Sequence, residues 1–260
     1  MSLTDKPVKT SYKDVLQIDN SNSGFDSTVR QVKSSDGSGS SIYVSQRTVK
    51  IQGNSDASTT LDVQDADGNT KLLVDTTNDY VKALGLHVNT QYVYFGAVST
   101  ESIWAGNTNN THYMIPFQSN SSSALVPIGT GLQPDTSFSI SATGDDIVNC
   151  MWYVLDNIII DRVVWWSGAD SGTADTTRAH LVSFDVVNDN SSTSGNLSNG
   201  VVVCDGADVV NNGNEDSHYQ LMTIQSPNID AGKAVFFTFR KDGTNSDYSL
   251  RATIKFHLRI

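Results

Sequence analysis

The stretch Thr59–Val88 reads TTLDVQDADGNTKLLVDTTNDYVKALGLHV and decides how the chain folds. It holds three pairs of apolar residues, and the members of each pair are two positions apart. Side chains two apart point to the same side of a strand, so each pair predicts a short strand with one buried face. The polar segment Asp65–Asn69 predicts a β-turn, because Asp, Gly and Asn favour turns and the Gly and Glu positions of an EF-hand loop are not matched.

One copy of this stretch has an apolar stripe too narrow to offset the entropy lost when the stretch becomes ordered. We therefore expect copies of the chain to complete one another's core here, as a short intertwined β-rich shaft in a homotrimer. The predicted trimer-interface residues are Leu61, Val63, Leu72, Val74, Leu84 and Leu86.

The bulk composition fits an all-β protein and disfavours several partners. The 260 residues are 38% hydrophobic and 17% charged, with a formal net charge of -11. Lys82 is the last Lys or Arg before Arg162. Because such a surface repels phosphate, we expect no binding to nucleic acid or to an anionic membrane. We also expect no membrane span, no signal peptide and no disulfide framework. Cys150 and Cys204 are expected to be buried thiols, with a single bridge between them as the alternative.

The chain divides into four segments by composition. Residues 1–47 are expected to form an N-terminal arm and anchoring segment, although the polar, basic residues 1–14 also suit a plain disordered tail. Residues 48–88 form the predicted shaft. Residues 89–135 are predicted to be an irregular, aromatic-containing connector, and residues 136–260 a jelly-roll-like β-sandwich.

The sandwich prediction rests on eight short apolar runs separated by turn residues. Val235/Phe237/Phe239 and the run from Leu250 to Leu258 alternate cleanly, so each strand has one buried face. No helix is expected, because no 3.6-residue period persists for more than a turn or two. The predicted strands are 138–142, 147–155, 158–166, 180–187, 201–204, 219–225, 234–240 and 250–260.

Several aromatic residues lie in polar surroundings, where they either stack on sugar rings or pack beneath the sandwich. The dipeptide Trp165-Trp166 is unusual because adjacent strand residues face opposite sides. One ring fills the core, and the other faces solvent, a neighbouring subunit or a ligand. The candidate ligand or partner contacts are Tyr92, Tyr94, Trp104, Tyr113, Trp165 and Trp166.

The sequence contains no motif of a known catalytic site. Its five histidines are scattered without HExxH, and no GxSxG elbow, phosphate loop or GxGxxG is present. We therefore expect a non-enzymatic protein without a metal or other cofactor, and we keep polysaccharide cleavage only as a weak alternative.

The N-terminal third resembles virion proteins of tailed bacteriophages. Tyr12–Phe25 (YKDVLQIDNSNSGF) and the following DSTVRQVKSSDGSGSSIYVS resemble the N-terminal segments of head-fibre and tail-fibre proteins. Residues 48–88 are similar to their short shafts, in which DxxGNTxLxVDTTN phrases recur. The chain lacks the extended repeats and coiled coil of long fibres, so a short appendage is favoured. The resemblance implies virion anchoring by Tyr12, Val15, Leu16, Ile18 and Phe25.

Two functions follow from this resemblance. The first is a trimeric capsid decoration or head fibre that docks on the major capsid protein. The second is a tail-borne adhesin, attached to a tail protein, that binds host-surface glycans. Both place the protein on the virion surface after assembly in the host cytoplasm.

The C-terminal strand gives a further expectation about subunit contacts. Its second face is basic and is either solvated or in contact with an acidic neighbouring subunit. The basic residues concerned, with three that are near in sequence, are Arg251, Lys255, His257, Arg259, Lys233, Arg240 and Lys241.

Overall fold

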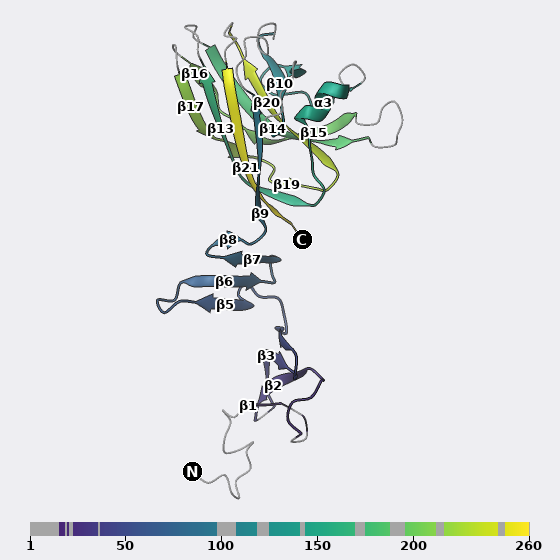
Figure 1. The fold of residues 1–260 in the computed structure, drawn as a ribbon, viewed down its shortest axis with the longest axis vertical. Helices are drawn as coiled ribbons and strands as arrows, with labels where there is room; N and C mark the ends of the chain where they lie inside the picture. The colour runs from purple at the N-terminus through teal and green to yellow at the C-terminus, as the bar shows by residue number, and fades with distance from the viewer. Residues whose placement is uncertain are drawn as a thin grey trace, which may run out of the picture. The chain divides into compact units, whose positions relative to one another are not determined.

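The computed structural model describes residues 16–18, 20, 23–35, 37–97, 108–118, 125–140, 144–169, 175–187, 196–211, 216–243 and 248–259. It is 61% strand and 2% helix, which confirms the all-β prediction. The chain forms two compact units, Met1–Val88 and Asn89–Ile260 (Figure 1). No helix in the described ranges has the length and apolar character needed to cross a membrane.

The first unit contains two separate four-stranded antiparallel sheets, each with its strands in sequence order. The strands of one sheet are β1 (Leu16–Ile18), β2 (Arg30–Ser34), β3 (Gly39–Val44) and β4 (Val49–Ile51). The strands of the other are β5 (Leu61–Gln64), β6 (Thr70–Asp75), β7 (Tyr80–Ala83) and β8 (Leu86–His87).

The β5–β6 connection is a tight turn organised by one carboxylate. Asp65 Oδ1 accepts hydrogen bonds from the backbone N–H of Asp67 (3.1 Å) and of Asn69 (2.8 Å). Gly68 has φ 82°, a left-handed conformation that glycine adopts without steric cost. Residues Asp65–Asn69 therefore form a tight turn, as the sequence predicts.

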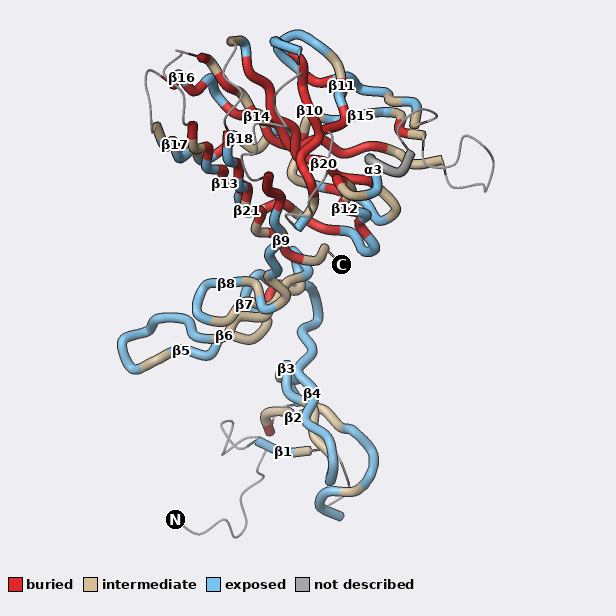
Figure 2. The backbone as a smooth tube through the Cα atoms, turned by 45° about the horizontal axis from the view of Figure 1, so that its top comes forward, coloured by how far each residue is buried: buried red, intermediate tan, exposed pale blue. Residues whose placement is uncertain are grey.

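Neither sheet of the first unit has a core of its own. Among the described residues up to Val88, only Ser35 and Asp75 are buried, and both are polar. Figure 2 shows the strands β1–β8 almost entirely as exposed or half-buried backbone. Each sheet is therefore a single layer within one chain, whereas stable domains pack at least two layers together.

The second unit is a β-sandwich of two antiparallel sheets. The smaller sheet runs β17-β13-β21-β9, with β19 paired to β13. Its strands are β9 (Thr90–Ala97), β13 (Ile158–Ala169), β17 (Asp216–Leu221), β19 (Asn228–Ile229) and β21 (Tyr248–Leu258).

The larger sheet runs β11-β10-β20-β14-β15-β18, with β12 paired to β20 and β16 to β14. Its strands are β10 (Thr111–Ile115), β11 (Val126–Thr130), β12 (Trp152–Tyr153), β14 (Asp175–Val186), β15 (Leu197–Asp205), β16 (Val209–Asn211), β18 (Thr223–Ile224) and β20 (Lys233–Lys241).

The main core lies between the two sheets and is rich in aromatic side chains. The Trp165 ring centroid is 6.0 Å from that of Phe239, and the Phe95 centroid is 6.1 Å from that of Phe237. A second cluster, which includes Val182, Phe184 and Phe236, lies on the other side of the larger sheet. Both faces of the larger sheet are therefore buried, whereas the smaller sheet buries only its inner face.

The structure corrects the prediction that residues 89–135 are an irregular connector. This segment supplies β9 to the smaller sheet and β10 and β11 to the larger one. All five residues of β10, including Tyr113, are buried. The pattern misled because β10 has no solvent face and β9 exposes tyrosines in place of polar residues, so neither strand alternates between apolar and polar.

Two further predictions near the start of the sandwich are wrong. The segment 147–155 is not one strand: the helix α3 (Gly144–Cys150) precedes the two-residue strand β12. Ile147 and Cys150, three positions apart, are buried on one side of the helix, and a single such pair is too short to reveal a helical period. In the described part of 138–142, Phe138 forms only an isolated bridge with Leu197.

Candidate functional site

The sheet β5–β8 gathers its aliphatic residues on one face. Residues paired across neighbouring strands share a face, and Leu61 pairs with Val74, which pairs with Val81. The next row pairs Val63, Leu72 and Ala83. We call this set the shaft face, and it consists of Leu61, Val63, Leu72, Val74, Val81, Ala83 and Leu86.

The opposite face of the same sheet is polar. Its central row pairs Asp62 with Leu73, Lys82 and His87. Lys82 Nζ lies 4.2 Å from the ring centroid of Tyr80, which also contacts the His87 ring at 5.1 Å. The polar face is thus suited to water, whereas no residue of the shaft face is buried within one chain.

Five of the six predicted trimer-interface residues belong to the shaft face, and Leu84 does not. Leu84 lies in the turn between β7 and β8 with φ 51°, followed by Gly85 at φ 79°. Its side chain is 74% exposed. The two left-handed residues form the tight turn of a hairpin, so the pair Leu84/Leu86 does not mark a strand.

The sheet β1–β4 repeats this arrangement. Ile18 pairs with Val32, Val44 with Val49, and Ile42 with Ile51. We call the apolar residues of this face the anchor face: Leu16, Ile18, Val32, Ile42, Val44, Val49 and Ile51. The register also places Arg30, beside Val44, and Ser34, beside Leu16, on the same side of the sheet. None of these residues is buried.

The predicted anchoring residues fall in different places. Leu16 and Ile18 lie on the anchor face. Phe25 lies in the segment between β1 and β2 and is exposed. Tyr12 and Val15 lie outside the described residues, as does Trp104 among the candidate ligand contacts.

The smaller sheet of the sandwich carries a mixed aromatic and cationic outer face. In β13 the two adjacent tryptophans separate as expected, because Trp165 is 1% exposed in the core and Trp166 is 51% exposed outside it. We call the outer residues of four neighbouring strands the aromatic face. They are Tyr92, Tyr94, Arg162, Val164, Trp166, Tyr219, Leu221, Arg251, Thr253 and Lys255.

The strand register arranges the aromatic face in three rows. One row runs from Tyr219 through Trp166 to Arg251. The middle row contains Leu221, Val164, Thr253 and Tyr94.

The third row places Arg162 beside Lys255 and Lys255 beside Tyr92. Arg251 lies over the Tyr94 ring at 5.3 Å, and Arg162 Nη2 donates a hydrogen bond to Tyr219 Oη at 3.5 Å.

Two hollows lie on this face. The larger, about 510 Å³, is lined by Tyr92, Asp161, Arg162, Val164, Tyr219, Thr253 and Lys255. The smaller, about 310 Å³, is lined by residues around Trp166 and Arg251. Both volumes fall within the range of about 300–1,000 Å³ typical of small-molecule sites. Of the remaining candidate contacts, Tyr113 is buried in the core and its hydroxyl accepts the N–H of Thr108 at 2.7 Å.

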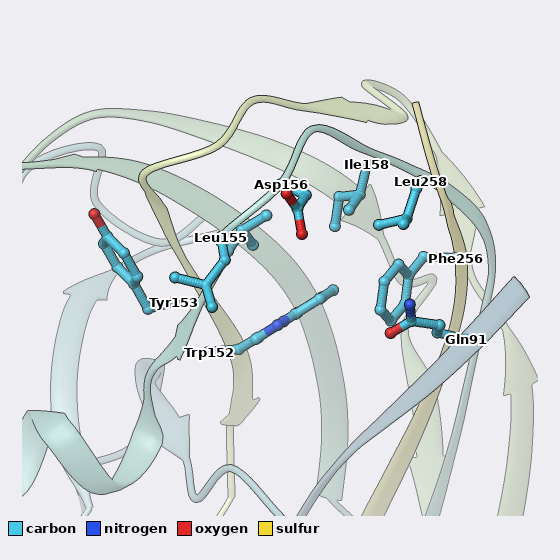
Figure 3. A pocket seen from close by; sticks show the side chains of 9 residues that line it. Gln91, Trp152, Tyr153, Leu155, Asp156, Ile158, Phe256 and Leu258 are labelled. Carbon is cyan, nitrogen blue, oxygen red and sulfur yellow. The ribbon is translucent and has the colours of Figure 1, made fainter. Parts of the chain in front are cut away.

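A third hollow, of about 190 Å³, lies where β12 and the following loop meet the ends of β13 and β21 (Figure 3). The Trp152 and Phe256 rings lie 5.0 Å apart beside it. Leu155 is 78% exposed next to this hollow. Asp156 is its single carboxylate, and the lining is otherwise apolar apart from Gln91 and Tyr153.

Most of the basic residues predicted to form one face with the C-terminal strand lie apart from one another in the structure. Arg259 pairs with Asp230, Lys233 pairs with Asp185, and His257 Nδ1 lies 2.9 Å from Asp161 Oδ1. Arg240 and Lys241 are buried in the larger sheet. The basic set on the outer face is instead Arg251, Lys255 and Arg162. Arg162 was missed because its neighbourhood depends on pairing between strands far apart in sequence.

A buried polar cluster spans β10, β14 and β15. Arg178 Nη2 donates to both carboxylate oxygens of Asp205, at 2.9 and 3.0 Å. His180 Nε2 lies 3.0 Å from Asp205 Oδ1, and the rings of His180 and His112 are 4.9 Å apart. Both imidazoles are fully buried, so they have no access to a substrate.

Burial lowers the pKa of His112 to about 3, assisted by repulsion from the nearby His180. Burial also lowers the pKa of His180 to about 4, although the Asp205 carboxylate opposes the change. Both imidazoles are therefore neutral at pH 7 and act as packed polar groups of the core.

The remaining reactive groups are enclosed. Cys150 and Cys204 are buried thiols, and burial raises the pKa of the Cys204 thiol to about 12. The described residues contain no group of three or more His, Cys, Asp or Glu side chains suited to a metal ion. No protein-family model matches the chain, and no curated protein is similar to it in sequence.

Proposed function

We propose that the chain is a non-enzymatic, homotrimeric surface protein of a tailed-phage virion, in the form of a capsid decoration or head-fibre appendage. The observation that carries this proposal is the uncovered pair of apolar faces in residues 16–88. The N-terminal third docks on the major capsid protein or a tail protein, and the sandwich projects from it. The resemblance of residues 12–88 to virion proteins supplies the phage context.

The shaft face argues for association between copies. Soluble monomers rarely expose large contiguous apolar patches, and such patches usually mark an interaction surface. The shaft face is wholly aliphatic, with no charged residue in its rows. The same face on another copy can pack against it, because burying aliphatic surface requires neither a specific hydrogen bond nor a charge partner.

The likeness to phage shafts supports three copies, and the two-faced sheet is compatible with a threefold axis. Identical chains assemble most simply about a closed symmetry axis. Three sheets placed around a threefold axis can turn their apolar faces inward and leave their polar faces, with Lys82 and His87, in water. The anchor face is the second apolar surface. In this proposal, part of it packs against the other copies and part against a protein of the virion.

The order of the sandwich strands supports a jelly roll. Several strands that lie close together along the chain belong to different sheets. This holds for the pairs β9/β10, β13/β14, β15/β17 and β20/β21, each with one strand in the smaller sheet and one in the larger. The two sheets then contain β9-β21-β13-β17 and β10-β20-β14-β15 as neighbours. This order matches two Greek keys wound together, an architecture used by viral capsid and lectin domains.

A second role is favoured by a separate observation, the aromatic face. Its exposed rings and cations suit a ligand better than they suit a solvated strand face. In this alternative the chain is a tail fibre or spike whose sandwich binds host-surface glycans.

The copy number per virion tests the proposal. Quantitative mass spectrometry of purified particles would compare the abundance of this chain with that of the major capsid protein. We expect the chain in particles, in a multiple of three, with hundreds of copies for a capsid position and about a dozen for a tail position. Its absence from purified particles would refute the virion role.

A further inference from the structure

We propose that the larger hollow on the aromatic face is a binding site for an acidic saccharide, such as a chain that carries uronate groups. This inference deepens the second role above and does not depend on the trimer. The ligand's sugar rings lie against the exposed tyrosines, and its carboxylate lies between Arg162 and Lys255.

The pairing of Arg162 with Lys255 is the first argument. These residues are direct neighbours across β13 and β21, on the same face of the sheet. Like charges directly opposite one another destabilise a sheet, and a bound anion would reverse that repulsion. The ion pairs among the described residues include neither side chain. The chain carries a net charge of -11, so two adjacent unpaired cations are an unusual feature of its surface.

The other charges around the hollow leave this positive site in place. Asp161 also lines it, with one oxygen 2.9 Å from His257 Nδ1, so the lining holds two cations and one carboxylate. Arg251 lies farther along the face, over the ring of Tyr94. An Arg guanidinium can bind a carboxylate through two parallel hydrogen bonds, while a Lys ammonium adds a flexible point charge.

The rings and hydroxyls around the cations identify the rest of the ligand. Tyr92 and Tyr219 lie on the two outer strands of the four, on either side of the cations. With strands about 4.8 Å apart, the two outer strands are about 14 Å apart across the sheet, and Tyr219 lies two rows along the strands from Tyr92. The C–H face of a sugar ring is apolar and packs on an aromatic ring, while its hydroxyls bond to polar groups such as Thr253.

A second copy of the chain is a poorer fit to this face. The shaft face, which suits association, has aliphatic rows without a charge, and the side of β1–β4 that carries the anchor face holds a single cation, Arg30. The aromatic face instead has cations in two of its three rows, which an apolar interface would have to desolvate. A mixture of aromatic rings, cations and hydroxyls in a hollow is typical of a site that orients a small polar ligand.

The test uses the full-length protein on an array of oligosaccharides that carry uronate, sialate, sulfate or no acid, with polyglutamate as a polyanion that lacks sugar. We expect binding to at least one acidic saccharide and no binding to its neutral counterpart or to polyglutamate. The variants Arg162→Gln and Lys255→Gln should each weaken this binding about tenfold. Tyr92→Ala should weaken it as well. Lys50→Gln, an exposed lysine on another sheet, should not.

The possible outcomes distinguish a failure of the proposed saccharide site from a failure of the proposed trimer. The mass of each protein is measured in the same samples. A trimer that binds no acidic saccharide would overturn the site and leave the trimer standing. A monomer that binds would do the reverse. If the variants change the mass and no saccharide binds, the face is a contact between copies. Equal binding to polyglutamate would show attraction to any polyanion and would also overturn the proposal.

Discussion

Replacing two aliphatic residues of the shaft face should dissociate the proposed trimer. The variant Leu72→Ser with Val74→Ser replaces two aliphatic side chains at the centre of β6, which lies between β5 and β7. Both side chains are half-buried in one chain and, in the proposed assembly, become fully buried against neighbouring copies. The perturbation thus acts on the contact between chains more than on the hydrogen bonds of the sheet.

The magnitude follows from the area that remains to be covered. Full burial of a Leu or Val side chain stabilises by about 1.5–3 kcal/mol, and roughly half of that remains for the assembly, about 1 kcal/mol each. Two side chains in each of three copies give about 6 kcal/mol per trimer. This corresponds to about four powers of ten in the trimer dissociation constant. The concentration of half-assembly varies as the square root of that constant, so it should rise about a hundredfold.

The matched control is Leu73→Ser. Leu73 lies between the two mutated positions in the same strand, is also half-buried, and belongs to the polar face beside Asp62 and Lys82. Sedimentation equilibrium over a dilution series would measure the half-assembly concentration of each protein. We expect a large increase for the double variant and a small one for Leu73→Ser. Equal effects of the two variants, or no effect of either, would refute the assignment of the shaft face.

Three further predictions concern other parts of the chain. Deleting residues 1–14 should leave the oligomeric mass and the thermal unfolding of the sandwich unchanged but abolish incorporation into particles; normal levels in purified virions would place the anchor elsewhere. The folded-state pKa values of His112 and His180, about 3 and about 4, lie below the ordinary 6.5, so the unfolded state binds more protons below pH 6.5. The melting temperature should therefore fall as pH decreases from about 6.5 to 4; a flat profile would contradict the burial of the pair. Cys150 and Cys204 should resist a thiol reagent in the folded protein and react in denaturant, and rapid labelling of the native chain would show that the core opens.

The sequence predicted elements wherever one face of a strand is apolar and the other polar. Leu61/Val63, Leu72/Val74 and the run from Leu250 have this alternation, and all lie in strands of the expected kind. Leu84 was wrongly assigned to a strand. It is the first residue of a left-handed turn with Gly85, a position usually occupied by Asn or Asp, so the turn was not evident from the sequence. Local sequence thus identified strands and failed at an atypical turn.

Strands without a polar face were harder to recognise. In β10 both faces are buried, so the period of two that marks a half-buried strand is lost. In β9 the outward positions are Tyr92 and Tyr94, which resemble core residues until the neighbouring strands are known. The prediction of an irregular connector over residues 89–135 failed for this reason.

The candidate site depended on register, which the sequence does not reveal. Trp166 was singled out as one half of a double tryptophan, but its neighbour Tyr219 lies 53 positions away in the chain. The Arg162–Lys255 pair likewise joins strands that are distant in sequence. His112 in β10 and His180 in β14 are neighbours because both strands pair with β20, one on each side of it. Long-range pairing of this kind becomes visible only in the folded chain.

The mass of the purified protein in solution shows directly whether the chain is a homotrimer. Light scattering coupled to size-exclusion chromatography measures that mass without reference to shape. We predict a species with three times the 28.1 kDa mass of one chain, stable on dilution and in the presence of a metal chelator. A folded species of 28.1 kDa at micromolar concentration would show that the shaft and anchor faces remain in water in a stable monomer, and would contradict the proposed homotrimer.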